Sequence, residues 1–116
     1  MRFVLVIVML SALLSCSSHE DVPAGIIPVT QMKFIMFDVI SAQEFALIRN
    51  PKDSNAARQK TFELCQQVFD IYKINRSDFF KSFNYYESNP DKLKILSDSL
   101  YAYGARKRQE IYLKMQ

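Results

Sequence analysis

Helix-start signals recur along the chain and restrict its fold more than any other feature. Asn75 is a typical side-chain cap, and Asn89 precedes Pro90, an order common in the first turn of a helix. Behind each signal, apolar residues recur every three or four positions, as they do along one face of a helix. The sequence has no glycine-rich turns and no strand-length alternation of polar and apolar residues. It therefore predicts an all-α domain.

We expect a small bundle of about four helices. Their predicted starts follow Thr30, Asp53 or Ser54, Asn75 and Asn89. The first helix should end near Arg49 and the second near Tyr72. The first is apolar on nearly all sides, so it should lie at the centre of the bundle. Two or three residues separate the last two helices, which predicts an antiparallel helical hairpin.

The N-terminal residues resemble a secretory signal. Arg2 is followed by an apolar run that ends at Leu14, and this run is too short to span the roughly 30 Å hydrocarbon core of a bilayer. The following Ser15 and Cys16 complete a resemblance to the bacterial lipobox. In that signal the cysteine thiol receives diacylglycerol, and cleavage makes the cysteine the first residue. The alternative is an ordinary signal peptide with an incidental cysteine.

The lipobox also sets the expected domain limits and the expected lipid. Acyl chains on Cys16 would hold the protein at a membrane that it does not cross, since each buried methylene contributes about 0.8 kcal/mol. This covalent lipid is the one cofactor that we expect. The predicted segments are a lipoprotein signal peptide (1–15), an acylated cysteine with a flexible tether (16–28), and a helical domain with a basic C-terminal helix (29–116).

The residues just behind Cys16 indicate a cellular location. Ser18, Glu20 and Asp21 resemble the signal that sends Bacteroidota lipoproteins to the cell surface. The alternative is a solvated linker, which is commonly polar and acidic as well. We expect an outer-membrane protein in the cell-surface leaflet, with the periplasmic leaflet as the alternative. Nucleic acid is not an expected partner there.

The residues after the tether offer no catalytic or metal-binding constellation. The only histidine, His19, lies in the tether, which removes the commonest base and metal ligand from the domain. Gly25 and Gly104 are the only glycines, so no phosphate loop exists. Cys65 lies in an apolar helical pattern, where a free cysteine is a small core residue. We expect no enzyme activity and no metal, and a small-molecule ligand is not favoured.

Asp38 interrupts the apolar pattern of the first predicted helix. An unpaired carboxylate would be costly to bury at that position. One interpretation is a functional site. The interpretation that we favour is an ion pair or a hydrogen bond to a neighbouring helix end, with Ser41 as a partner on the same face.

Closely spaced tyrosines indicate a contact surface. Tyr85 and Tyr86 point about 100° apart on a helix, so they cannot both face one core. Tyr101 and Tyr103 pose the same problem. One tyrosine of each pair is expected at the surface or against a partner, because tyrosine is enriched at interfaces. The alternative is ordinary amphipathic tyrosines with solvated hydroxyls.

The C-terminus is basic in a chain of formal net charge +3. Arg106, Lys107, Arg108 and Lys114 outnumber the single Glu110. We interpret this stretch as a solvated helix end, which is favourable beside the negative pole of a helix dipole. The alternatives are anionic lipid headgroups or an acidic partner.

A motif in the second half of the chain resembles a known family. It reads F-x-x-S-x-x-Y-Y-x-x-N-P and comprises Phe79, Ser82, Tyr85, Tyr86, Asn89 and Pro90. With the lipobox and the Ile26-Ile27-Pro28 segment, it is similar to the small Bacteroidota lipoproteins named domain of unknown function 4296. The resemblance runs from Ile27 to about Tyr103. In the first helix the family tends to read D-x-H-x-x-E, whereas this chain has Asp38, Ile40 and Gln43.

The resemblance implies an accessory lipoprotein of an outer-membrane complex, such as the β-barrel assembly machinery. The anchor, the helices and the absence of catalytic groups agree with this. We therefore expect a non-catalytic subunit that contacts other proteins of an envelope complex. The alternative is a lipoprotein that holds an apolar ligand or a lipid between its helices.

Overall fold

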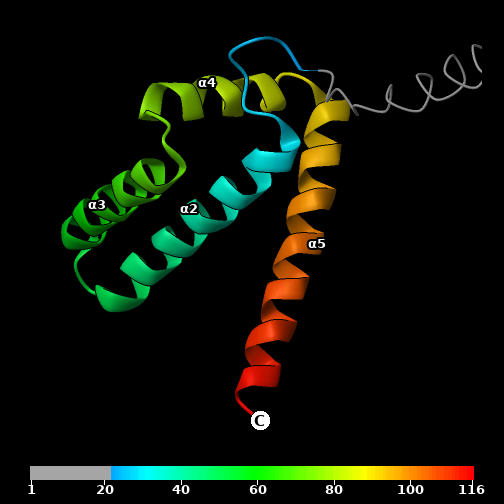
Figure 1. The fold of residues 1–116 in the computed structure, drawn as a ribbon. Helices are drawn as coiled ribbons and strands as arrows, with labels where there is room; N and C mark the ends of the chain where they lie inside the picture. The colour runs from blue at the N-terminus through cyan, green and yellow to red at the C-terminus, as the bar shows by residue number, and fades with distance from the viewer. Residues whose placement is uncertain (1–21) are drawn as a thin grey trace, which may run out of the picture.

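The computed structural model describes residues 22–116, and their regular structure is entirely helical (Figure 1). Four helices follow one another: α2 (Val29–Arg49), α3 (Ser54–Tyr72), α4 (Arg76–Glu87) and α5 (Pro90–Lys114). This part of the chain contains no strand. The prediction of a small all-α bundle of four helices is confirmed.

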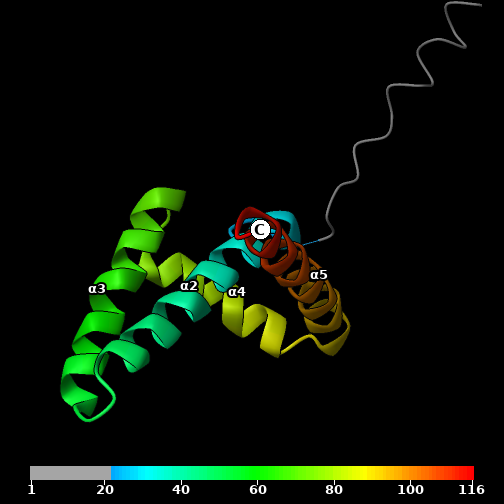
Figure 2. The same cartoon turned by 90° about the horizontal axis from the view of Figure 1, so that it is seen from below.

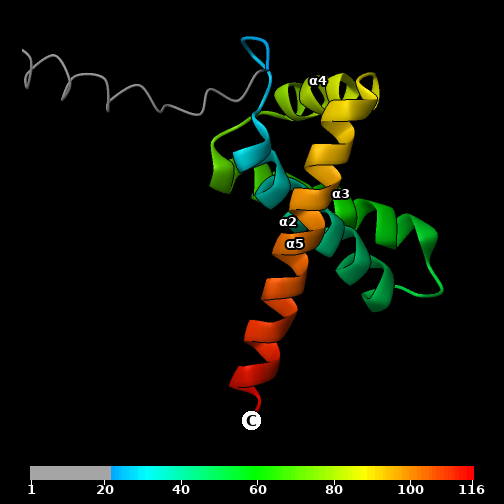
Figure 3. The same cartoon turned by 90° about the vertical axis from the view of Figure 1, so that its right-hand side faces the viewer.

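α2 is the central helix, as its apolar surface predicts. α3 returns beside it after a turn at residues 50–53, and α5 crosses it on another side (Figures 1 and 2). α4 lies across the end of the bundle where α2 and α5 begin (Figure 1). A short connection joins α4 and α5, as expected of a hairpin. The two helices do not lie side by side, however, and point in clearly different directions (Figure 3). The expected side-by-side alignment is not observed, because the buried face of α4 packs against α3 and the segment before α2.

Side-chain caps define where α3 and α4 begin. Asp53 Oδ1 accepts hydrogen bonds from the backbone N–H groups of Asn55 at 3.0 Å and Ala56 at 2.9 Å. Asn75 Oδ1 accepts one from the N–H of Asp78 at 2.7 Å. Each bond satisfies a donor that the first turn of a helix leaves without an intrahelical partner. Both helices start where the sequence predicts.

The other two expected caps are corrected by the structure. α2 begins at Val29 directly after Pro28, so Thr30 lies inside the helix. Asn89 precedes α5 but caps nothing with its side chain. Its Nδ2 instead donates a hydrogen bond to the carbonyl of Tyr85 at 2.6 Å, back into the last turn of α4. Pro90 at the first helical position supplies a backbone angle already suited to the start of α5.

The hydrophobic core lies where α2, α3, α4 and the first half of α5 meet. Its most deeply buried large apolar side chains are Met32, Ile35, Phe69, Tyr86 and Leu96. The ring centroids of Phe69 and Phe79 lie 5.1 Å apart and join α3 to α4. Cys65 is buried in the same cluster, which confirms its interpretation as a core residue.

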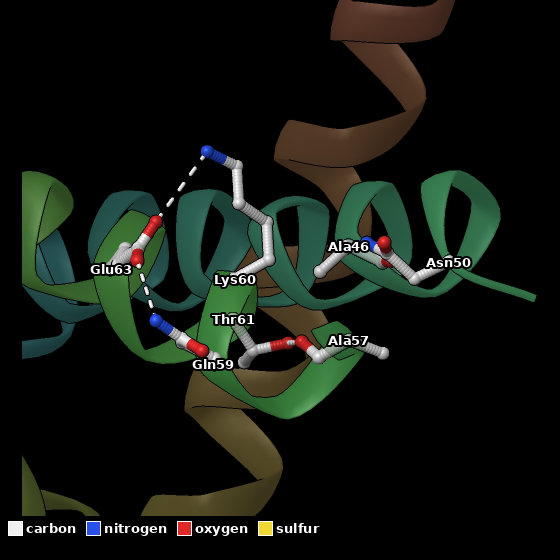
Figure 4. Close-up of polar contacts among 7 residues, drawn as sticks. All are labelled: Ala46, Asn50, Ala57, Gln59, Lys60, Thr61 and Glu63. Carbon is white, nitrogen blue, oxygen red and sulfur yellow. Dashed lines mark hydrogen bonds and ion pairs between the residues drawn. The ribbon is translucent and has the colours of Figure 1, made fainter. Parts of the chain in front are cut away.

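Small residues allow α2 and α3 to approach each other near their turn. Ala46 and Ala57 are both buried there, and neither carries atoms beyond its Cβ. Asn50 Nδ2 donates to the carbonyl of Ala46 at 3.0 Å, and Thr61 Oγ1 donates to that of Ala57 at 2.9 Å (Figure 4). These polar side chains are thus satisfied within or next to their own helix and leave the contact between the helices apolar.

α5 crosses α2 at Gly104. A Cβ atom at this position would lie 3.4 Å from Cε2 of Phe37, at the short limit of ordinary van der Waals contact, so the two helices pack closely here. Tyr103 fills the crossing, with its ring edge-on to Phe34 at 4.7 Å and to Phe37 at 5.1 Å between centroids. Past the crossing, α5 projects away from the other helices (Figure 3). Every residue from 108 to 116 is exposed.

Candidate functional site

The family-like motif on α4 holds the segment that leads into α2. Ser82 Oγ accepts a hydrogen bond from the backbone N–H of Ile27 at 2.9 Å, and Tyr86 Oη donates one to the Ile27 carbonyl at 2.8 Å. Ser82 and Tyr86 lie four positions apart, so they share one face of the helix. All three residues are buried. Buried backbone groups need partners, and α4 supplies both for Ile27.

This geometry gives the motif a structural role. Phe79 packs in the core, Asn89 binds back to the end of α4, and Pro90 starts α5. One member of the pair Tyr85 and Tyr86 was expected at the surface or against a partner, and Tyr86 is not that member, because it is fully buried at 0% exposure. The reason is its hydroxyl, whose bond to Ile27 lets a tyrosine occupy the core. The spacing of Ser82 and Tyr86 signals a shared face, but the sequence does not show what that face binds.

The other three tyrosines predicted as contact residues differ in exposure. Tyr103 is half-buried in the crossing of α2 and α5. Tyr85 is half-buried beside Tyr86, with ring centroids 5.5 Å apart. Tyr101 is 74% exposed, so its ring faces solvent. Each pair therefore has one more deeply packed member, and Tyr101 is the predicted contact residue that is most open to a partner.

Asp38 is bound by the last residue of α3. Tyr72 Oη donates a hydrogen bond to Asp38 Oδ2 at 2.7 Å, which is the predicted bond to a neighbouring helix end. Burial, and after it the hydrogen bond and the charge of Asp38, raise the pKa of the Tyr72 hydroxyl above its usual value. Ser41 is not the partner, because its hydroxyl donates to the carbonyl of Phe37 at 2.8 Å. Asp38 thus ties α2 to α3.

The end of α5 carries apolar side chains that the sequence analysis did not single out. We call residues 108–116 the distal arm. Its exposed apolar residues are Ile111, Tyr112, Leu113 and Met115, at 57%, 67%, 64% and 80% exposure. Ile111 and Met115 follow Gly104 by seven and eleven positions, which returns them to the same side of a helix. Ile111 and Met115 therefore lie on the side of α5 that packs against α2 at Gly104, but in the part of α5 that α2 does not cover.

Basic side chains lie on and beside the distal arm, as the sequence predicts for a solvated helix end. Lys107 Nζ lies 3.4 Å from Glu110 Oε2. The charge of Glu110 raises the pKa of the Lys107 ammonium, which stays protonated. Arg108 and Lys114 are exposed. The arm therefore combines apolar residues with a net positive charge. The spacing of Ile111 and Met115 from Gly104 indicates that they share one side of the helix. Whether that side is exposed depends on where α2 ends, which the spacing does not show.

The predicted lipidation site and the predicted export signal lie outside the described residues. This applies to Cys16, the proposed lipidation site, and to Ser18, Glu20 and Asp21, the proposed export signal. Within residues 22–116, no helix has the length and apolar character needed to cross a bilayer. In the same residues, no three histidine, cysteine, aspartate or glutamate side chains gather as metal ligands.

The fold and the motif together define a small helical domain. In this domain, α4 holds the segment before α2 through hydrogen bonds to Ile27. The chain belongs to the family described as domain of unknown function (DUF4296), whose model matches residues 23–110. The expected match to domain of unknown function 4296 is confirmed. The matched region includes Ile27 and the whole α4 motif, and it ends inside the distal arm. No curated protein and no solved structure shows a significant match to the chain.

Proposed function

We propose that this chain is a lipid-anchored, non-catalytic subunit of an outer-membrane complex and that its distal arm contacts a protein partner. The observation that carries the proposal is the exposed stripe of Ile111 and Met115, with Tyr112 beside it. Exposed apolar patches mark interaction sites, and tyrosine, methionine and arginine are enriched in them. A helix that continues past its last packing contact gains nothing from apolar residues unless another surface covers them.

The charge of the arm defines the partner surface. Arg108 and Lys114 border the apolar side chains, and one acid, Glu110, opposes them within the arm. A complementary partner would present an apolar strip with an acidic rim, because opposite potentials favour encounter and fix the register of an interface. We therefore propose an acidic-rimmed protein surface as the binding site for the arm.

The direction of α5 supports a protein partner over lipid headgroups. Val22, the first described residue, lies near Lys92 and Ile95 at the beginning of α5. The arm is at the other end of this helix (Figure 1). At 1.5 Å per residue, 25 residues extend about 37 Å. A tether that enters beside the start of α5 therefore joins the domain at the end of α5 opposite the arm.

The cellular setting follows from the expected signals. The lipobox at Cys16 supports a lipoprotein, and the acids behind it resemble the surface-export signal of Bacteroidota lipoproteins. The proposed location is the outer membrane, in the cell-surface leaflet. The proposed complex is the β-barrel assembly machinery. Replacing Cys16 with serine should release the protein from the membrane fraction, and a Cys16→Ser protein that still sediments with membranes would contradict the anchor.

Site-specific photo-crosslinking in cells tests the arm directly. A photoreactive amino acid at Tyr112 should yield a crosslink to one dominant membrane protein. The same amino acid at Gln67, an exposed position on α3, is the matched control and should yield none. Equal crosslinking from both positions, or no crosslink from Tyr112, would contradict the proposal.

A further inference from the structure

An apolar groove lies between α2, α3 and α4, on a different part of the molecule from the distal arm. It encloses about 520 Å³, within the roughly 300–1,000 Å³ typical of ligand sites. Its apolar lining includes Val39, Ile40, Phe62, Phe79, Phe80 and Phe83. Ile40, Phe62 and Phe80 remain 40–57% exposed although they are apolar. The rim of the groove therefore offers apolar surface that the protein itself leaves uncovered.

The groove is positively charged. Its charged lining residues are Arg58 and Arg76, and no aspartate or glutamate of residues 22–116 lines it. The guanidinium carbon of Arg76 lies 4.2 Å from the ring centroid of Phe62 and 5.5 Å from that of Phe69. Nη2 of Arg76 is buried and makes no hydrogen bond. The aromatic faces offset part of the cost of burying this cation, but they do not replace a hydrogen-bond acceptor.

The floor of the groove contains no anion that could pair with Arg76. Cys65 is the ionisable group there, and burial raises the pKa of its thiol while the Arg76 charge acts in the opposite direction. The thiol is therefore neutral near pH 7. Thr61 is also engaged, since its hydroxyl donates to the Ala57 carbonyl. Among the described residues, no side chain or backbone group accepts a hydrogen bond from Nη2 of Arg76.

We propose that this groove binds a single-chain amphiphile with a carboxylate head, as in a long-chain fatty acid. The alkyl chain lies against the phenylalanine rings, and the carboxylate accepts hydrogen bonds from the guanidinium of Arg76. Arginine suits this role because its planar group matches a carboxylate. The site is separate from the distal arm, so the proposal does not depend on the proposed partner contact.

Charge complementarity favours this occupant over a second copy of the chain. The apolar segment that another copy could insert is its distal arm, which is basic, and two arginines line the groove. Like charges at such a contact are unfavourable. Sugars and nucleosides are also disfavoured, because their hydroxyl and ring polar groups would lose water against phenylalanine side chains.

Photolabelling of the full-length protein in membranes tests the site. The probe is a palmitate analogue with a diazirine in its chain, and labelled peptides are identified by mass spectrometry. Labels should fall on α2, α3 and α4 residues of the groove. Palmitate should compete at least about tenfold better than hexadecanol, because the alcohol has the same chain without the charge. Equal competition, or labels concentrated on the distal arm, would overturn the proposal.

Two arginine variants sharpen the same test. Arg76→Gln should weaken competition by palmitate at least about tenfold and leave that by hexadecanol unchanged. Arg49→Gln is the matched control, because Arg49 also lies over a phenylalanine ring, at 5.3 Å from Phe45, but outside the groove. Palmitate and hexadecanol should compete for labelling of the Arg49→Gln protein as they do for the unchanged protein. If Arg76→Gln does not fold, the palmitate and hexadecanol comparison on the unchanged protein decides the question.

Discussion

The α4 motif and the distal arm of α5 have similar side chains but opposite surroundings. On α4, Tyr86 is fully buried and its hydroxyl is bonded to the chain. On the arm, Tyr112 is 67% exposed and the end of α5 projects away from the other helices (Figure 3). The family model covers the first region entirely and ends within the second, at residue 110. The comparison indicates that the α4 motif maintains the fold, while the apolar side chains of the arm from Ile111 onward stay exposed beyond the region that the family model matches.

The largest expected effect is the replacement of Tyr86 by alanine. This change removes a fully buried ring and leaves the Ile27 carbonyl without its partner. Phe→Ala and Trp→Ala changes in cores cost about 3–5 kcal/mol, and Tyr86→Ala should lower the free energy of unfolding by a similar amount. Tyr112→Ala in the arm should change it by less than about 0.5 kcal/mol. Urea denaturation followed by circular dichroism measures both, and equal effects would remove the distinction between the two regions.

A smaller loss is expected for Ser82→Ala. The buried N–H of Ile27 would then have no acceptor, which costs about 1–3 kcal/mol. Ser97→Ala is the matched control, because Ser97 is exposed on α5 and should change stability by less than about 0.5 kcal/mol. The same urea titration compares them. A Ser82→Ala protein as stable as the control would show that α4 does not depend on its bond to Ile27.

Tyr72→Phe should remove about 0.5–1.5 kcal/mol near neutral pH, because its hydroxyl bonds to Asp38. The raised pKa of Tyr72 adds a pH dependence. The folded state holds the phenol proton more tightly than the unfolded state, so this stabilisation is present below about pH 10 and is lost as the pH rises above it. The difference in stability between the unchanged protein and Tyr72→Phe should therefore shrink above pH 10. Tyr101→Phe, at an exposed site, is the matched control.

The smallest expected effect is the removal of residues 111–116. These residues are all exposed, so stability should change by less than about 0.5 kcal/mol. Leu96→Ala, at 1% exposure on the packed half of the same helix, should cost about 2–5 kcal/mol. Thermal unfolding of the two variants compares the halves of α5. A large loss on truncation would mean that the arm belongs to the core.

Local signals in the sequence predict much of the fold. Asp53 and Asn75 cap their helices where expected, because a cap involves residues only two or three positions apart. Asn89 looks like the same signal, yet its side chain turns back to Tyr85. The angle between α4 and α5 was not predictable either, because it follows from what the face of α4 binds.

The candidate site was less predictable for the same reason. The sequence places Ser82 and Tyr86 on one face, but Ile27 lies 55 and 59 positions away from them. Likewise, the stripe that continues from Gly104 to Ile111 can be read from spacing, whereas its exposure depends on where α2 ends. Long-range packing therefore decides which apolar residues become core and which remain open to a partner.

The central claim is that the distal arm, and not apolar exposure in general, contacts the partner. Crosslinking from Tyr112 identifies the partner. The most direct measurement is then the amount of this partner that co-purifies with a variant carrying both Ile111→Asn and Met115→Asn. We predict a loss of at least about tenfold with unchanged thermal unfolding, because central interface residues carry most of the binding energy. Ile71→Asn, at a 73% exposed position on α3, should retain the partner. Full recovery of the partner by the arm variant would contradict the account.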